Sequence, residues 1–203
     1  MTHSASAPAP CIGVLLAAGA GLRYRQAGGS SHKLLAQLPD GTPVALRSAQ
    51  ALHAVTPDLL VMVGANDTEL APLLRAIPCQ QGTAPAGAEA GMGATLAAAA
   101  RWLLAHAADH THALVALADM PWIAPATLHA VADADPALEI VAPAYAGRRG
   151  HPVRFARALW PALAALSGDQ GARALLQRHG VHEIAVHDAG ILRDVDLPQD
   201  LAR

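Results

Sequence analysis

A run of small residues follows the first apolar segment of the chain. The segment CIGVLL leads directly into Ala17, Ala18, Gly19, Ala20 and Gly21, so nothing larger than a methyl group projects from this turn. Small residues allow backbone N–H groups to approach an anion closely, and a helix that begins at Gly21 would add the partial positive charge of its amino end. The sequence therefore predicts a phosphate-binding loop, with an ordinary tight glycine turn as the alternative.

Two cationic side chains, Arg23 and Lys33, come after the small-residue loop. A nucleoside triphosphate carries several negative charges, and arginine and lysine are the side chains that pair with phosphate oxygens. We predict that both cations contact the phosphates of a nucleotide, and solvated surface charge is the alternative. A dinucleotide site is a poor match, because the loop does not have G-x-G-x-x-G spacing and no acidic residue ends the second strand region.

Aspartates follow two other segments of the chain. Asp119 ends the apolar run HALVALA, and Asp194 and Asp196 lie in GILRDVDLP. A buried carboxylate needs a compensating partner, and Mg²⁺ prefers oxygen ligands and often takes one or two protein carboxylates together with substrate phosphates. We predict a metal site at Asp119 with Asp194 or Asp196, which strand alternation places on the same side. The alternative is that Asp119 and Asp196 cap the helices that follow them.

Two glycine-containing segments could contact the remainder of the substrates. GMGAT at 91–95 precedes a predicted helix and could bring backbone groups against a base or ribose. GRRGHPVRF at 147–155 holds Arg148, Arg149 and His151 and could receive an anionic acceptor. An ordinary helix entry and a surface hairpin are the respective alternatives.

These candidate residues require a scaffold that gathers the ends of several strands. Short apolar runs alternate with alanine- and leucine-rich segments of helical period, which favours a mostly parallel sheet covered by helices on both faces. We predict one α/β domain over residues 11–203, preceded by a disordered tail at residues 1–10. In such sheets ligands bind beyond the carboxyl ends of the strands. The predicted strands span 11–16, 59–63, 112–118, 140–144 and 183–186, and the predicted helices span 43–54, 67–76, 93–107, 125–134, 157–166 and 170–179.

Composition argues against several classes of partner. The formal net charge of -2 gives no electrostatic reason to expect nucleic acid or a membrane surface as a partner. No apolar stretch is long enough to span a bilayer, and the first ten residues are unlike a signal peptide. Cys11 and Cys79 match no metal or redox spacing, which fits a reducing compartment. We expect a cytoplasmic protein that is a monomer or a weak dimer.

Several motifs occur in an order that is typical of one enzyme family. They are LLAAGAGLRYR, HKLL, GMGATL, ALADMPW, GRRGHPVRF, GDQGARALL and LRDVDLPQDL, and they span the chain from about Gly13 to Leu201. Together they resemble the nucleotidyltransferase family typified by CTP:molybdopterin cytidylyltransferase. The resemblance implies a single Rossmann-like nucleotidyltransferase domain. It also implies Mg²⁺-dependent transfer of CMP from CTP to molybdopterin, with release of pyrophosphate.

The same resemblance implies roles for individual residues. The small-residue loop with Arg23 and Lys33 would hold the triphosphate, and these two cations would act in catalysis with Asp119. Asp119 and an aspartate of the DVD segment, for which we take Asp196, would hold Mg²⁺. The nucleoside would lie beside Gly91, Met92, Gly93 and Thr95, and the acceptor beside Gly150, His151, Pro152, Asp169 and Gly171.

Other functions could use the same scaffold. GTP could replace CTP, and methylerythritol phosphate or a sugar phosphate could replace the pterin. A non-enzymatic alternative is a maturation factor that binds molybdenum cofactor for hydroxylases such as xanthine dehydrogenase, which would then be a partner. The presence of Arg23, Lys33, Asp119 and Asp196 together favours the enzyme.

Overall fold

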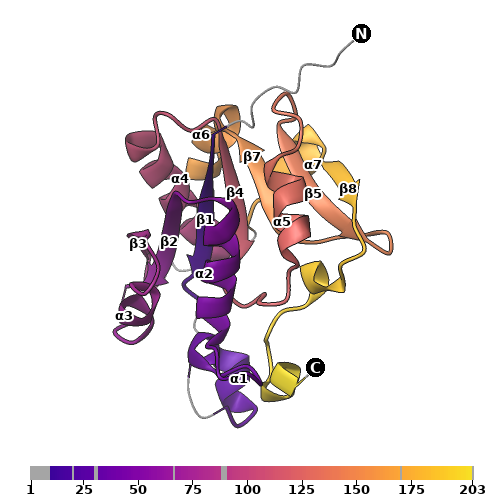
Figure 1. The fold of residues 1–203 in the computed structure, drawn as a ribbon. Helices are drawn as coiled ribbons and strands as arrows, with labels where there is room; N and C mark the ends of the chain where they lie inside the picture. Colours follow the sequence, from indigo (N-terminus) through magenta and orange to yellow (C-terminus); the bar gives the residue numbers. More distant parts are fainter. Residues whose placement is uncertain are drawn as a thin grey trace.

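A central sheet with helices on both faces organises the computed structural model of the chain (Figure 1). The structure describes residues 10–19, 21–29, 32–65, 67–87, 91–169 and 171–202. Nine residues of the predicted tail, 1–9, lie outside the described residues, as do Ala20 of the small-residue loop and Gln170 at the predicted start of the last helix.

Within the described ranges, eight strands form one sheet in the order β3-β2-β1-β4-β7-β5-β6, and β8 pairs with β5. β1 is parallel to β2 and β4, and β8 is parallel to β5. β2 is also parallel to β3. The sheet is therefore mostly parallel, although β7 is antiparallel to both β4 and β5 and β6 is antiparallel to β5. The strands are β1 (Cys11–Ala17), β2 (Leu59–Gly64), β3 (Gln80–Ala84), β4 (His112–Leu117), β5 (Ile140–Tyr145), β6 (Arg148–Arg149), β7 (Val153–Ala156) and β8 (His182–Ala185).

The helices cover the two faces of the sheet in two groups. One hydrophobic cluster joins the sheet to α2, α3 and α5, and a second joins it to α4, α6 and α7. In β1, Leu15 and Ala17 belong to the first cluster, whereas Ile12 and Val14 belong to the second. Burial on both faces explains why this strand is a continuous apolar run. The α-helices are α1 (Leu22–Gln26), α2 (Val44–Val55), α3 (Leu70–Leu74), α4 (Met92–His106), α5 (Pro125–Ala132), α6 (Trp160–Ala164) and α7 (Arg173–His179).

Short 3-10 helices also lie between and after these elements in the described ranges. They are η1 (Lys33–Leu35), η3 (Arg157–Leu159), η4 (Ala189–Leu192) and η5 (Pro198–Ala202). In the described ranges, none of the helices combines the length and the apolar character that a membrane span requires.

The strand order fixes where a ligand can bind. From β1 the chain passes to β2 and β3 on one side of the sheet, whereas β4 lies on the other side of β1. This reversal opens a crevice beyond the carboxyl ends of β1 and β4, which is where ligands bind in open α/β sheets. The small-residue loop follows β1 and Asp119 follows β4, so both lie at this crevice.

The predicted fold class is confirmed, and all five predicted strands are present with small shifts in their bounds. β3 was missed because its sequence, QQGTA, is polar and the strand lies at an edge of the sheet. β7 was missed because Arg154 interrupts its apolar run. Arg154 is nevertheless buried, since its guanidinium donates to the backbone carbonyls of Ala132, Ala134 and Asp135.

The predicted helices near 67–76, 157–166 and 170–179 are shorter in the structure. Asp67 precedes α3, and its carboxylate accepts a hydrogen bond from the N–H of Leu70. Residues 67–69, which were predicted as the first turn of the helix, therefore lie before it. η3 occupies the start of the predicted helix at 157–166, and α6 begins only at Trp160. α7 begins at Arg173, after the turn at Gly171 and Ala172.

Candidate active site

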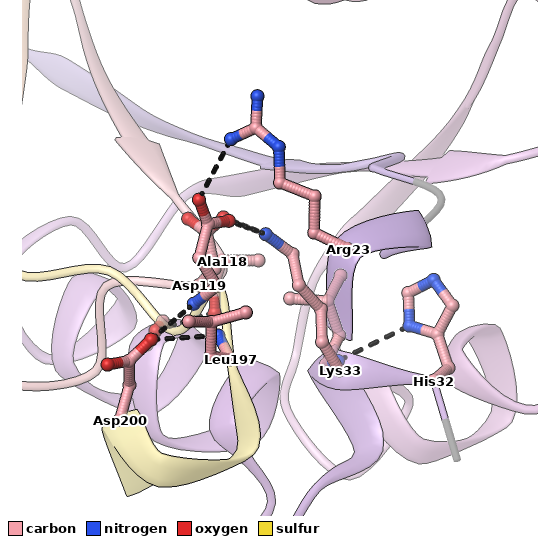
Figure 2. Close-up of polar contacts among 10 residues, drawn as sticks. Arg23, His32, Lys33, Ala118, Asp119, Leu197 and Asp200 are labelled. Atoms are coloured by element: carbon pink, nitrogen blue, oxygen red, sulfur yellow. Dashed lines mark hydrogen bonds and ion pairs between the residues drawn. The ribbon is translucent and has the colours of Figure 1, made fainter. Parts of the chain in front are cut away.

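Two cations and two carboxylates meet at the crevice (Figure 2). The ammonium Nζ of Lys33 lies 2.6 Å from Oδ2 of Asp119 and 3.4 Å from Oδ1 of Asp196. The guanidinium of Arg23 lies 3.2 Å from Oδ2 of Asp196. These residues come from η1, from the loop after β4, from the segment before η5 and from α1. The fold therefore brings together residues that lie up to 173 positions apart in the sequence.

Lys33 is held in place by its neighbours in η1. His32 caps this short helix, because its Nδ1 accepts a hydrogen bond from the N–H of Leu34, and the Leu34 side chain is buried in the core. The Lys33 side chain is only 10% exposed. Burial alone would lower the pKa of Lys33, but the ion pairs with Asp119 and Asp196 outweigh burial and raise this pKa, so the ammonium stays charged.

A third carboxylate, Asp194, completes an acidic cluster with Asp119 and Asp196. One oxygen from each residue lies within 4.8 Å of the others. Burial raises the pKa of Asp194, and the negative charges of Asp196 and Asp119 raise it further. Oδ1 of Asp119 is buried and has no hydrogen-bond partner among the described residues. A set of three hard oxygen ligands with one unsatisfied acceptor fits a divalent cation such as Mg²⁺ or Mn²⁺.

The helix-capping alternatives for Asp119 and Asp196 do not match the geometry. The first turn of α5 is bonded by Asp188, whose Oδ2 accepts from the N–H of Ala124 and the hydroxyl of Thr127. Asp200, rather than Asp196, accepts from backbone N–H groups before η5, as Figure 2 shows. The carboxylates of Asp119 and Asp196 are therefore directed at the cationic side chains.

Two hollows open beside the acidic cluster. The larger has a volume of about 480 Å³, and Asp119 forms part of its wall. The smaller has a volume of about 230 Å³ and reaches Asp196. The larger hollow is lined by Leu16, Ala18, Gly19, Leu22, Pro85, Gly91, Met92, Thr95, Leu117, Asp119 and Asp169, and the smaller by Gly21, Leu22, Arg23, Tyr24, Lys33 and Asp196. Together they provide room for a nucleotide next to the carboxylates.

Most residues predicted to bind the nucleotide line one of these hollows, but two described ones do not. Ala17 is the buried last residue of β1. Gly93 donates its N–H to the carbonyl of Gly168 at 2.8 Å, and a side chain at Gly93 would collide with the backbone of Ser167 and Gly168. Ala17 and Gly93 are therefore buried and do not line either hollow.

The residues predicted to bind the acceptor fall into two separate groups. Gly150, His151 and Pro152 lie between β6 and β7, and the N–H of His151 donates to the carbonyl of Ile191 at 3.1 Å. Asp169 instead lines the larger hollow with Gly91, and Gly171 lies beside Met92. The structure thus places Asp169 and Gly171 with the residues of the larger hollow and apart from His151.

The surroundings of His151 favour an uncharged imidazole. Its Nδ1 is buried and has no hydrogen-bond partner in the described part of the chain. Burial lowers the pKa of His151, and the negative charge of Asp119 opposes this shift only in part. A lowered pKa favours the neutral imidazole near neutral pH.

Arg148 and Arg149 lie in a surface hairpin, which was the alternative to an anion-binding turn in this segment. Arg148 and Arg149 form β6, which pairs with the end of β5, and both are exposed. Arg149 lies 3.7 Å from Glu183 on β8.

The sequence interpretation missed several residues near the site. Leu22 lines both hollows and is 61% exposed, and Pro85 lines the larger one. Asp188 and Asp200 bond the backbone on either side of the DVD segment. A large apolar side chain directly after a loop of small residues was a usable signal for Leu22, whereas a single aspartate such as Asp188 has no distinguishing pattern.

Comparisons with known proteins agree with this arrangement. The family model of the MobA-like NTP transferase domain matches residues 13–184. No curated protein matches the chain at a significant level. The crystal structure of Rv0371c from Mycobacterium tuberculosis is 29% identical over 96% of both chains, with a TM-score of 0.74. A second structure of Rv0371c, described as a complex with manganese, is 30% identical over 94% of this chain and 95% of that chain, with a TM-score of 0.73.

More distant structures share the fold. A nucleotidyl transferase from Methanothermobacter has a TM-score of 0.77 at 21% identity, over 94% of this chain and 93% of that chain. Molybdopterin-guanine dinucleotide biosynthesis protein A from Archaeoglobus fulgidus has a TM-score of 0.65 at 17% identity, over 94% of both chains. Because the family model covers most of the chain and Rv0371c matches it over nearly its full length, this protein belongs to the MobA-like NTP transferase family and is a nucleotidyltransferase.

Proposed function

We propose that this nucleotidyltransferase transfers CMP from CTP to molybdopterin and releases pyrophosphate. The observation that carries the proposal is the meeting of Lys33, Asp119, Asp194 and Asp196 at the wall of a hollow that is large enough for a nucleotide. The choice of cytidine rests on the resemblance of the AAG tripeptide and the ADMP segment to the cytidine branch of the family, and the choice of pterin rests on the family resemblance of the ordered motifs. As proposed, the enzyme acts in the cytoplasm as a monomer or weak dimer and supplies a molybdenum hydroxylase.

Different residues of the crevice would bind the phosphates, the metal and the nucleoside. Arg23 and Lys33, with the backbone N–H groups of the loop after β1, would contact the phosphates of CTP. Asp119, Asp194 and Asp196 would hold Mg²⁺, which when bound supplies positive charge that neutralises and orients phosphate oxygens. The larger hollow would receive the cytidine.

The chemical step requires little from the protein besides positioning and charge. A phosphate oxygen of the acceptor attacks the α-phosphorus of CTP, a new P–O bond forms, and the bond to the departing pyrophosphate breaks. The acceptor phosphate is already ionised near neutral pH, so no general base is needed. Arg23 and Lys33 would stabilise the charge that grows on pyrophosphate, and the neutral imidazole of His151 would position the acceptor.

A pyrophosphate-release assay tests the proposal. Each nucleoside triphosphate would be incubated with the protein and Mg²⁺, with and without molybdopterin. We expect release only with CTP and molybdopterin together. Release of pyrophosphate with GTP, or with methylerythritol phosphate or a sugar phosphate as acceptor, would mean that the proposed substrates are wrong. Tight pterin binding without release under any condition would indicate the maturation factor instead.

Two exposed apolar side chains are expected to contact the nucleoside. Leu22 and Met92 line the larger hollow and are 61% and 48% exposed, although large apolar side chains gain stability from burial. The nucleobase or ribose of CTP would cover them. Replacing either residue with alanine should weaken CTP binding by about ten-fold. Isothermal titration calorimetry in the presence of Mg²⁺ measures this change.

Inorganic tripolyphosphate and a distant leucine provide the controls. Tripolyphosphate has no nucleoside, so its affinity should be unchanged in Met92→Ala. Leu22 also lines the smaller hollow, so Leu22→Ala should lower the tripolyphosphate affinity less than it lowers the CTP affinity. Leu104 is 40% exposed on α4 but does not line the hollow, so Leu104→Ala should change neither affinity. Equal losses of CTP and tripolyphosphate affinity in the first two variants would contradict a contact with the nucleoside.

A further inference from the structure

Asp188 connects the C-terminal part of the chain to the start of α5. Its Oδ2 accepts hydrogen bonds from the N–H of Ala124 at 2.8 Å and from the hydroxyl of Thr127 at 2.8 Å. Its Oδ1 accepts from the N–H of Gly190 at 2.9 Å. A single carboxylate thus satisfies donors from two segments that are about sixty positions apart in sequence. Such a carboxylate fixes the relative placement of the two segments, because hydrogen bonds to a charged acceptor are short and strong.

Residues 188–196, which we call the C-terminal strap, are attached at two further points. The carbonyl of Ile191 accepts from the N–H of His151 at 3.1 Å, and the N–H of Val195 donates to the carbonyl of Asp119 at 2.9 Å. The side chains of Ile191 and Val195 are fully buried. The strap is therefore held in one defined position beside Asp119.

The strap carries two of the three carboxylates of the acidic cluster. Asp194 and Asp196 flank the buried Val195 and lie between η4 and η5, outside any regular element. No helix or strand fixes their distance from Asp119, so the attachments of the strap must do so. Lys33 pairs with both Asp119 and Asp196, and one oxygen from each of the three carboxylates lies within 4.8 Å of the others, so a shift of the strap would change the geometry of the whole cluster.

We infer that Asp188 is a positioning residue for the divalent cation. By fixing the start of the strap to α5, it acts together with the hydrogen bond from Val195 to the carbonyl of Asp119 to set the distance between Asp119 and the carboxylates of Asp194 and Asp196. This inference rests on the proposed function, because it takes these three residues as the metal ligands. Residues that hold metal ligands in place commonly change metal affinity by about 10- to 100-fold when they are replaced.

Direct measurement of Mn²⁺ binding tests the inference independently of activity. Electron paramagnetic resonance of the full chain would give the Kd for Mn²⁺ in the wild type and in Asp188→Ala. We expect the Kd to rise by about ten-fold or more in the variant. Asp188→Asn keeps one carbonyl acceptor, so its Kd should lie between those of the wild type and the alanine variant.

Asp67 provides the matched control for a purely structural effect. Its Oδ1 accepts from the N–H groups of Glu69 and Leu70 at the start of α3, so it makes the same kind of contact as Asp188 but lines neither hollow. Asp67→Ala should lower the melting temperature by an amount similar to Asp188→Ala and leave the Kd for Mn²⁺ unchanged. An unchanged Kd in Asp188→Ala would overturn the inference.

A milder variant covers the case in which Asp188→Ala does not fold. Thr127→Val removes one donor to Asp188 and keeps the side-chain shape, so the Kd for Mn²⁺ should rise by about two- to three-fold. Failure of the inference differs from failure of the proposed function. If the wild type binds Mn²⁺ and transfers nucleotide while Thr127→Val and Asp188→Asn retain its Kd, only the inference fails. If the wild type does not bind Mn²⁺, both fail.

Discussion

Replacing Asp119 with alanine is expected to lower the rate of nucleotidyl transfer by about 10³-fold and to leave the fold intact. Asp119 contributes one oxygen to Lys33 at 2.6 Å and holds a second, buried oxygen without a partner in the described part of the chain. Loss of this carboxylate would remove a proposed metal ligand and the main partner of the Lys33 ammonium at the same time. The backbone carbonyl of residue 119 still accepts from Val195, and β4 remains paired with β1 and β7, so the sheet is unaffected.

The effect of Asp119 can be separated from a general loss of charge. Asp119→Asn keeps the shape of the side chain and should lose both turnover and Mn²⁺ binding. Asp58→Asn is the control, because this carboxylate pairs with His110 and lines a different pocket. Steady-state kinetics with CTP would show a fall in kcat for Asp119→Asn and normal kinetics for Asp58→Asn. Near-normal turnover in Asp119→Ala would remove the metal assignment.

The part of the fold that could be predicted from sequence is the part buried on both faces. β1, β2 and β4 are continuous apolar runs, and their parallel pairing follows from the helices between them. β3 and β7 could not be predicted in this way. The polar β3 depends on its neighbour β2 for pairing, and β7 contains an arginine whose partners are backbone carbonyls at the end of a distant helix. Such partners are a tertiary property that no local pattern encodes.

The candidate site shows the same division. Residues that follow strands, such as Arg23 and Asp119, could be found because the carboxyl ends of neighbouring parallel strands must meet. Lys33 could be proposed from its charge, but its position depends on η1 and on the buried Leu34. The role of Asp188 and the split between His151 and Asp169 could not be predicted, because both depend on how the strap and the loop before α4 pack. The roles of these residues remain predictions that the variants above test.

Replacing Lys33 with methionine is expected to have two opposite effects. Turnover should fall by about 10²- to 10³-fold, because the ammonium that would stabilise the charge on pyrophosphate is lost. The affinity for Mn²⁺ without nucleotide should instead rise by about ten-fold, because Lys33 is a cation that already neutralises the carboxylates at which the metal would bind. Its Nζ lies 2.6 Å from Asp119 and 3.4 Å from Asp196, and both contacts weaken the attraction of the acidic cluster for another cation.

Arg23 provides a control for the competition between the Lys33 ammonium and Mn²⁺ for the carboxylates. It also pairs with Asp196, at 3.2 Å, but its side chain is 80% exposed and the interaction is therefore screened by solvent. Arg23→Met should lower turnover yet change the Kd for Mn²⁺ by less than about two-fold. Weaker or unchanged Mn²⁺ binding in Lys33→Met would mean that Lys33 supports the metal site and does not compete with it. Tighter binding would mean that arrival of the metal releases Lys33 toward the phosphates, so that metal and nucleotide favour each other's binding.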